Sequence, residues 1–130
     1  MFEYELTILE HHLDTFGHVN NATYAEIYEE ARWDLITKNG YGLDEVQSSR
    51  IGPVILEMNI KFIKEIKLRT KIKILTQAVN PEKKISIIEQ KMVLPNGDVA
   101  SEAKFTFGLF NLDERKLVPP PEKWLKAVSP

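Results

Sequence analysis

The order in which hydrophobic patterns follow one another constrains the fold of this chain most strongly. From Phe2 to Ile8, apolar side chains alternate with polar ones, and this period of two predicts a strand with one buried face that runs to about His11. Residues 20–38 carry apolar side chains at helical spacing, which predicts one long helix. The glycines at positions 40 and 42 are expected to end it.

Four further strand patterns follow the helix. After a short helix or turn at about residues 43–47, we expect strands at about 54–62, 69–79, 85–94 and 99–112. In the first of these strands, the even-numbered apolar residues from Val54 to Phe62, including Leu56 and Met58, are expected to share one face. Asn96-Gly97 predicts a tight hairpin turn before the last strand, because this pair supplies the positive φ angles that such a turn needs. A terminal helix is expected at residues 122–128, after three prolines.

The order of the elements predicts the fold class. One strand, a long helix and four strands joined mainly by hairpins indicate an α+β protein with an antiparallel sheet and the helix packed on one face. A chain of 130 residues, 43% of them hydrophobic, has the size of one domain, and we expect residues 1–130 to form it. Such a sheet keeps open edges and a second face, so we expect a homodimer or a homotetramer.

Composition excludes several classes of function. The absence of cysteine excludes a disulfide framework, a cysteine nucleophile and cysteine-ligated metal sites. A formal net charge of −2 gives no field that would attract nucleic acid or an anionic membrane. Glu3 and Glu5 stand where a secretory signal needs positive charge, and no apolar run is long enough to span a membrane. We therefore expect a soluble cytoplasmic protein without a nucleic-acid or membrane partner.

The segment from Asp14 to Tyr24, between the first strand and the helix, concentrates the chemistry. It places a carboxylate (Asp14), an imidazole (His18) and the start of a helix within one short loop. N–H groups in the first turn of a helix have no intrahelical acceptor, so they can donate to an oxygen that gains negative charge. Asp14 can attack a carbonyl carbon or activate a water molecule beside it. The segment therefore suits the hydrolysis of a thioester.

The sequence DTFGHVNNATY at residues 14–24, with Glu29 downstream, resembles the active-site segment of the 4-hydroxybenzoyl-CoA thioesterase group of hotdog-fold enzymes. The resemblance implies a five-stranded antiparallel sheet wrapped around one long helix. It also implies that Asp14, three residues before Gly17, is the essential acid and that the backbone N–H of Asn21 donates to the oxyanion. The implied reaction is the hydrolysis of an acyl-CoA thioester, without a cofactor.

HVNN at residues 18–21 also resembles the fatty acyl-ACP thioesterases, and in these enzymes the residues that correspond to Asp14 and His18 are catalytic. Residues 58–64 and 118–122 extend the family likeness over most of the chain. Phe16 departs from the acyl-ACP pattern, because those enzymes carry a catalytic Asn there. Lys64-Glu65-Ile66 replaces the common Arg-Pro-Ala, but Glu65 falls where the acyl-ACP enzymes place a further acidic or thiol residue.

The residue chemistry and the resemblances together give a set of candidate site residues. The candidate catalytic residues are Asp14, His18, Glu29 and Glu65, and the candidate substrate-binding residues are Gly17, Asn21, Tyr24 and Lys64. Structural alternatives stay open for several of them. Asp14 and Asn21 suit caps or turns, His18 an ordinary loop, Glu29 a solvated helix face beside Arg32, and Tyr24 core packing.

Two clusters invite binding of an ion or a phosphate. The basic cluster consists of Lys61, Lys64, Lys67 and Arg69. It suits the phosphates of coenzyme A, with a solvated surface as the alternative. The second set consists of His11, His12, Asp14 and His18. Neighbouring residues on a strand point to opposite faces, so His11 and His12 are not expected to hold one ion, and we expect no metal.

The expected function is the cleavage of acyl-CoA, or of a similar pantetheine thioester, to a free acid and a thiol. A single short unit with a net charge of −2 favours acyl-CoA over an acyl carrier protein, because that acidic protein needs a broad basic docking face. The alternatives are an acyl-ACP thioesterase, a hotdog dehydratase or hydratase, and a non-catalytic acyl-CoA-binding module.

Overall fold

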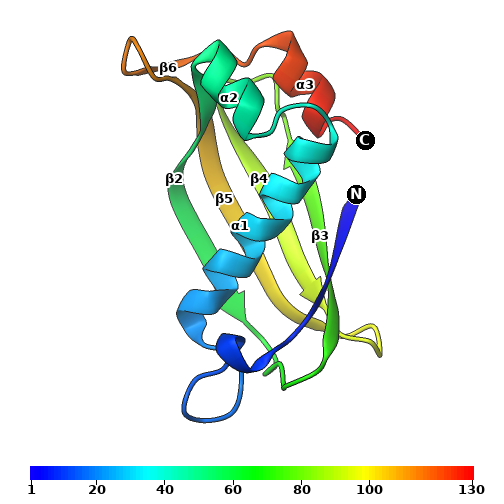
Figure 1. Cartoon of the computed structure of the whole chain (residues 1–130). Coiled ribbons are helices and arrows are strands. Elements are labelled where there is room, and N and C mark those ends of the chain that lie inside the picture. Colours follow the sequence, from blue (N-terminus) through cyan, green and yellow to red (C-terminus); the bar gives the residue numbers. More distant parts are fainter.

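The computed structural model describes all 130 residues. Its strands are β1 (Phe2–Thr7), β2 (Ile51–Phe62), β3 (Lys71–Val79), β4 (Ile85–Val93), β5 (Val99–Asn111) and β6 (Lys116–Val118). Its helices are α1 (Asn21–Lys38), α2 (Leu43–Ser49), α3 (Glu122–Val128) and the short 3-10 helix η1 (Glu10–His12). The sheet is antiparallel, in the order β1-β3-β4-β5-β2 with β6 beside β5, and α1 crosses one face of it, here called the inner face (Figure 1). The α+β class with one long helix on the sheet is thereby confirmed.

The long helix α1 forms where the sequence predicts it, because one side is apolar and both ends are capped. Asn20 is the N-cap, and its side-chain oxygen accepts the Ala22 N–H at 2.8 Å. After the last turn, Gly40 takes a φ of 91°, which ends the helix. The buried residues recur every three or four positions: Tyr24, Ile27, Tyr28, Ala31, Leu35 and Ile36. None of the helices combines the length and the hydropathy needed to cross a membrane.

The core under α1 consists of two hydrophobic clusters. The first, beside the N-terminal half of α1, includes Met92 and Phe105, and the second, beside α3, includes Ile88 and Trp124. On β4 the residue between Ile88 and Met92 on the inner face is Gln90, a buried polar residue. The two clusters are therefore separated by a polar layer at this level of the sheet.

The first strand is shorter than the sequence predicts. It ends at Thr7 instead of His11, and residues 10–12 form η1. In η1 the His12 Nδ1 accepts the Leu9 N–H at 2.8 Å, and the His12 N–H donates to the Leu9 carbonyl at 3.0 Å. Local side-chain bonds of this kind compete with a sheet ladder, so the polar run Glu10-His11-His12 leaves the strand.

The edge strand β2 contains a β-bulge that the sequence pattern does not predict. Ile55 pairs with Phe107 but Glu57 pairs with Thr106, so Leu56 is an extra residue. The bulge reverses the alternation, since Ile55 shares the inner face with Phe107 whereas Val54, opposite Gly108, lies on the outer face. The prediction that Val54 and Leu56 share a face with Met58 is therefore wrong, because a strict period of two does not survive an inserted residue.

Other element boundaries differ by a few residues. β2 begins at Ile51 rather than at Val54. β3 begins at Lys71 rather than at Arg69, whose φ of 63° interrupts the extended backbone. The hairpin at Asn96-Gly97 and the terminal helix α3 lie where they were expected, and Gly97 has a φ of 93°.

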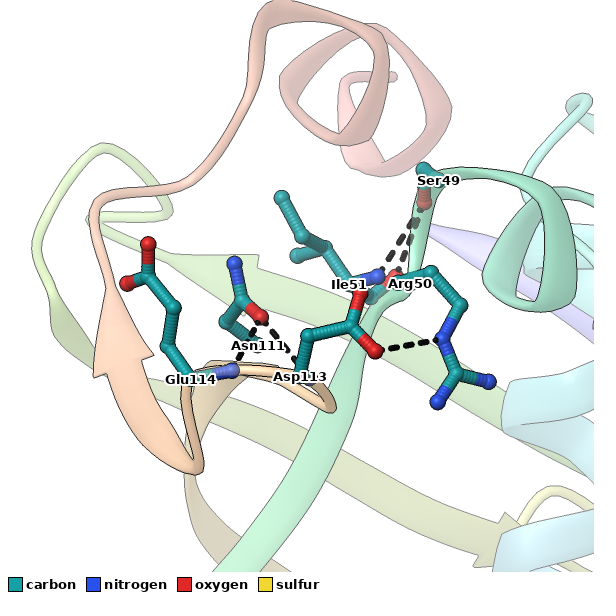
Figure 2. Close-up of polar contacts among 6 residues, drawn as sticks. All are labelled: Ser49, Arg50, Ile51, Asn111, Asp113 and Glu114. Atoms are coloured by element: carbon teal, nitrogen blue, oxygen red, sulfur yellow. Dashed lines mark hydrogen bonds and ion pairs between the residues drawn. The ribbon is translucent and has the colours of Figure 1, made fainter.

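A tight turn after β5 explains the sixth strand, which the sequence analysis did not predict. The Asn111 side-chain oxygen accepts the N–H groups of Asp113 and Glu114, both at 2.9 Å, and Asp113 accepts from Arg50 Nε at 3.1 Å (Figure 2). These bonds return the chain alongside β5 as the three residues of β6. The turn depends on the side chain of Asn111, so it lacks the glycine that usually marks a hairpin.

Candidate active site

A tight loop holds Asp14 and His18 close to each other. Leu13 and Val19 form an antiparallel bridge at its base, and the Asp14 N–H donates to the His18 carbonyl at 3.0 Å. Gly17 makes the turn with a φ of 86°. As a result, the His18 Nδ1 lies 4.0 Å from the Asp14 Oδ2. The structure thus brings together the carboxylate and the imidazole that the sequence singled out.

The two carboxylate oxygens of Asp14 have different surroundings. Oδ1 accepts the Phe16 N–H at 2.8 Å, which fixes the side chain against its own loop. Oδ2 faces His18 and accepts no hydrogen bond from within the chain, and the side chain is 21% exposed. Oδ2 is therefore the oxygen that is free to act on a ligand. The Phe16 N–H is a contact that the motif could not reveal, because a backbone group carries no residue signature.

Phe16 also contributes its ring to the loop. The ring is 83% exposed and lies nearly parallel to the His18 imidazole, with 6.2 Å between the centroids. The exposed ring is available for contact with a ligand. Where the acyl-ACP thioesterases carry a polar Asn, this chain therefore presents an aromatic ring beside His18.

The segment after β2 forms a second wall beside the loop. His18 and Lys67 form an antiparallel bridge, and the Val19 N–H donates to the Ile66 carbonyl at 3.1 Å. This pairing carries Glu65 toward the helix entrance. Burial and the nearby Glu65 carboxylate raise the pKa of Tyr24. Glu65 and Tyr24 therefore face the same region, next to the Asp14 loop.

The entrance of α1 has one free backbone donor. The Ala22 N–H is satisfied by the Asn20 side chain, and the N–H groups of Thr23 and Tyr24 donate to the Asn20 carbonyl at 3.0 and 3.4 Å. The Asn21 N–H makes no hydrogen bond within the chain, and the residue is exposed. The positive end of the helix dipole coincides with this group. The structure thus offers one donor to an anionic oxygen, on the residue that the sequence indicated.

An apolar shelf runs from the helix entrance along the inner face of β2. It consists of Ile55, Met58, Ile60 and Phe62, which lie opposite the inner-face residues of β5. At its start, the Tyr24 ring meets Phe62 edge-on at 4.9 Å. Phe62 and Met58 remain 52% and 55% exposed. The alternating pattern predicted apolar residues here, but it could not show that the shelf stays uncovered.

Two candidate residues lie away from the loop. Glu29 is exposed on α1, two turns beyond Asn21 and about 12 Å along the helix axis. Lys64 forms an ion pair with Asp98 at 2.6 Å, on the side of the β4–β5 hairpin. The structure does not bring either side chain to the carboxylate of Asp14 within the chain.

The basic cluster is largely neutralised by carboxylates. Besides Lys64 with Asp98, Arg69 bonds both oxygens of Glu10 at 2.8 and 2.9 Å, and Lys67 lies 3.7 Å from Glu65. Lys61 alone in the cluster has no ion pair. These pairs are exposed and weak, so a phosphate group can compete for the cations.

The histidine set does not assemble into a metal site. His11 and His12 lie in η1 with their rings 4.0 Å apart, so the expectation that a strand separates them is wrong. The Nδ1 of His12 is already used by the Leu9 N–H, however. No group of three His, Asp or Glu side chains in the structure lies close enough together to hold a metal ion.

A hollow of the chain lies elsewhere, on the outer face of the sheet. It measures about 550 Å³ and is lined by charged side chains such as Lys61, Glu89 and Lys104. It contains no residue of the Asp14 loop. Its open, charged walls suit solvent better than an acyl chain, so we place the candidate site at the loop and not at this hollow.

The chain has relatives of known family. A family model described as the thioesterase-like superfamily matches residues 9–128. The chain is 32% identical over 113 residues to the long-chain acyl-CoA thioesterase FadM of Escherichia coli (strain K12), and the match covers 86% of this chain and 85% of the relative. It is 30% identical over 106 residues to the chloroplastic acyl-acyl carrier protein thioesterase ATL2 of Arabidopsis thaliana, with 80% of this chain and 56% of that protein covered.

Among solved structures, the YbaW probable thioesterase from Escherichia coli has the same fold. The two structures superpose with a TM-score of 0.86 at 27% sequence identity, and the match covers 98% of each chain. The family model extends over the Asp14 loop, the helix α1 and the sheet, which are the parts that build the candidate site. The chain thus belongs to the thioesterase-like superfamily, its fold is the hotdog fold, and the hydrolysis of an acyl thioester is its reaction.

Proposed function

We propose that this protein hydrolyses acyl-CoA thioesters at the loop formed by Asp14, His18 and Asn21. One observation carries the proposal: a free carboxylate oxygen, Asp14 Oδ2, lies at the same helix entrance as the free Asn21 N–H. Hydrolysis of a thioester needs both a base or nucleophile and a donor to the developing oxyanion. The long-chain acyl-CoA activity named for the Escherichia coli relative supports this class of substrate.

In the proposed reaction, the Asn21 N–H donates to the carbonyl oxygen of the thioester and binds it more strongly as negative charge develops. Asp14 Oδ2 either attacks the carbonyl carbon or takes a proton from an attacking water molecule. In both routes the C–S bond breaks, a water oxygen enters the acid product, and the thiolate of coenzyme A takes up a proton. His18 orients the substrate or delivers that proton.

Other residues of the proposed site position the two ends of the substrate. Tyr24 begins the apolar shelf, along which the acyl chain extends. Gly17 has open space where a Cβ would lie, which leaves room for the pantetheine arm. Glu65 orients the attacking water beside Tyr24, and Lys64 exchanges Asp98 for a phosphate of coenzyme A.

A homodimer, or a tetramer built from such dimers, completes the proposed site. The edge strand β2 has no neighbour on one side, and Leu56, Met58, Phe62 and Ile63 on or beside it are about half exposed. Open strand edges and exposed apolar side chains are covered by a second copy in many proteins. Glu29 lies beyond the reach of Asp14 in its own protomer, so a catalytic role for Glu29 requires that it serve a site shared with the second copy.

The proposal is tested by thiol release from a panel of saturated and 2-enoyl acyl-CoA substrates. Hydrolysis produces one thiol for each acid, and this outcome is expected for the saturated substrates. Hydration of the 2-enoyl substrates without thiol release would indicate a dehydratase or hydratase. Tight binding of acyl-CoA without any turnover would indicate a binding module, and either result would overturn the proposal.

A further inference from the structure

The polar layer between the two core clusters contains a cation with no carboxylate partner. Arg32 on α1 donates through Nη1 to the Gln90 side-chain oxygen at 3.0 Å. The Gln90 amide nitrogen in turn donates to the Tyr28 carbonyl at 3.1 Å and to the Thr76 hydroxyl at 3.0 Å. The two N–H groups of Gln90 are thereby used by neutral acceptors, and its oxygen accepts from Arg32. The positive charge of Arg32 remains without an ion pair.

The guanidinium of Arg32 is partly buried but keeps free donors. Its central carbon lies 4.1 Å from the centroid of the Phe105 ring. Burial lowers the pKa of Arg32 to about 10, with the Glu29 carboxylate opposing the shift, so the group is charged at neutral pH. Five N–H groups belong to a guanidinium, and only one is used within the chain. The Trp124 Nε1 is the only fully buried side-chain nitrogen or oxygen without a partner, so the remaining Arg32 nitrogens are not fully buried.

The Arg32 guanidinium lies over Phe105, a β5 residue that pairs with the apolar shelf, and its distance from the Asn21 N–H can be estimated along α1 and β2. Phe105, under the guanidinium, pairs with Met58 of the shelf. Along α1, Arg32 lies about 16 Å beyond Asn21. Along β2, Met58 lies about 13 Å from Phe62, where the shelf begins. Three bonds of an extended chain span about 3.5 Å. An acyl chain of about a dozen carbons is therefore long enough to cover these distances, from the oxyanion donor Asn21 to Arg32.

We propose that Arg32 recognises an oxygen-bearing group, a carboxylate or a hydroxyl, at the far end of an acyl chain of about this length. The inference rests on the proposed function, because it takes the carbonyl group to lie at Asn21. An unpaired, partly buried cation at the end of an apolar surface disfavours a methyl terminus, which leaves its N–H groups without an acceptor. A terminal carboxylate supplies both the charge and the geometry that a guanidinium binds best.

The test compares substrates in matched pairs. Dodecanoyl-CoA is compared with ω-hydroxydodecanoyl-CoA and with the CoA monothioester of dodecanedioic acid. Octanoyl-CoA and the CoA monothioester of octanedioic acid form a second pair that is too short to reach Arg32. Each ratio of kcat/KM, oxygenated over plain substrate, is measured for the wild type, for Arg32→Met and for Arg32→Lys. Arg115→Met is the control, because Arg115 also lies over an aromatic ring, Phe110 at 5.0 Å, but on the distant turn after β5.

For the long dicarboxylic pair, we expect Arg32→Met to lower the ratio at least ~10-fold, the scale of a lost charge-assisted hydrogen bond. Arg32→Lys should restore part of it. The short pair should give the same ratio in all variants, and Arg115→Met should match the wild type in both pairs. An unchanged long-pair ratio in Arg32→Met would overturn the inference and leave Arg32 as a structural anchor for Gln90.

A second measurement keeps the test independent of folding and of turnover. Binding of free dodecanedioate and free dodecanoate to the wild type is compared by calorimetry, and the dicarboxylate is expected to bind at least ~10-fold more tightly. Equal affinities would contradict the role of Arg32. If the dicarboxylate binds as expected but no acyl-CoA is hydrolysed, the proposed function fails and the binding site for the distal group stands.

Discussion

The His18 Nδ1 lies 4.0 Å from the Asp14 Oδ2, and the backbone bond from the Asp14 N–H to the His18 carbonyl at 3.0 Å fixes the two residues in this relation. The distance is too long for a hydrogen bond between the side chains. Neither ring nitrogen of His18 is used by the carboxylate, so both stay available to the substrate. This arrangement gives Asp14 and His18 separable roles.

His18→Ala should lower kcat by about 10-fold, which is less than the fall expected for Asp14→Asn. Orientation and proton delivery contribute less to the rate than the base or nucleophile does. Steady-state thiol release with one acyl-CoA measures both variants. His11→Ala, an exposed histidine outside the loop, is the control and should match the wild type. A loss in His18→Ala equal to that in Asp14→Asn would move the proton-transfer role to His18.

His12 should make the protein less stable in mild acid. Burial, and then the charge of His11, lower the pKa of His12 below its ordinary value of 6.5, while Glu26 and Glu30 on α1 oppose the shift. Because the folded pKa is lower than the unfolded one, the unfolded state binds the proton more readily. The contribution is complete above about pH 6.5 and is lost as pH falls through the folded pKa. Protonation of Nδ1 also breaks its bond with the Leu9 N–H.

The measurement for His12 is urea denaturation at about pH 7.5 and about pH 5.5, on either side of the unfolded pKa. The wild type should lose more unfolding free energy between the two conditions than His12→Asn does, since asparagine offers an uncharged acceptor to Leu9. His11→Asn removes only the second of the two causes and leaves the burial of His12 in place, so it should reduce the pH dependence less than His12→Asn does. An identical pH dependence in the wild type and in His12→Asn would contradict this role.

The sequence predicts the fold well wherever local signals and the tertiary structure agree. The helix α1 has both an apolar stripe and the Asn20 cap, and the β4–β5 hairpin has Asn96-Gly97, so both appear as expected. The bulge at Leu56 depends on one inserted residue, and the short β1 depends on the His12 side chain. Neither feature can be recognised in the hydrophobic periodicity of the sequence. The candidate site divides in the same way. The loop carries a motif that the sequence shows. The roles of the Phe16 N–H and of the charged Arg32 depend on their contacts in the folded chain, so the sequence alone does not predict them.

Carrier recognition should depend on the basic cluster in spite of its ion pairs. Lys64→Ala and Lys67→Ala are expected to raise KM for acyl-CoA about 3-fold to 10-fold each, because each removes a cation that a phosphate can claim. KM for the matching acyl-pantetheine, which has no nucleotide, should not change. Lys116→Ala is the control. It removes a lysine that is likewise paired with a carboxylate, Glu114 at 3.4 Å, but at the opposite end of the molecule, so KM for acyl-CoA should not change.

The outcome that contradicts nucleotide recognition is a strong preference for the acyl carrier protein over both smaller substrates, with no advantage of coenzyme A over pantetheine. In that case Lys64 and Lys67 form a docking surface for the carrier protein. The plant relative, an acyl-acyl carrier protein thioesterase, makes this the comparison to include.

Leu56→Glu should weaken the proposed dimer. Leu56 is the bulged residue of the open edge strand and is 49% exposed, so a second copy on this edge buries it and a charge there is costly. Light scattering at micromolar concentration should show a dimer or tetramer for the wild type and a smaller species for the variant. Leu43→Glu, at an exposed leucine on α2, is the control. A fully active wild-type monomer would contradict a site shared between copies.

The central claim is tested most directly by thiol release from dodecanoyl-CoA with Asp14→Asn. Asparagine preserves the size of the side chain and the acceptor for the Phe16 N–H, but it removes the charge of Oδ2. The account predicts a fall in kcat of at least ~100-fold, the scale of a lost general base or nucleophile, with little change in Tm. Asp34→Asn, which breaks a surface pair with Lys38, is the control and should retain wild-type kcat. Wild-type turnover in Asp14→Asn would contradict the account and leave Asp14 as a turn-forming residue.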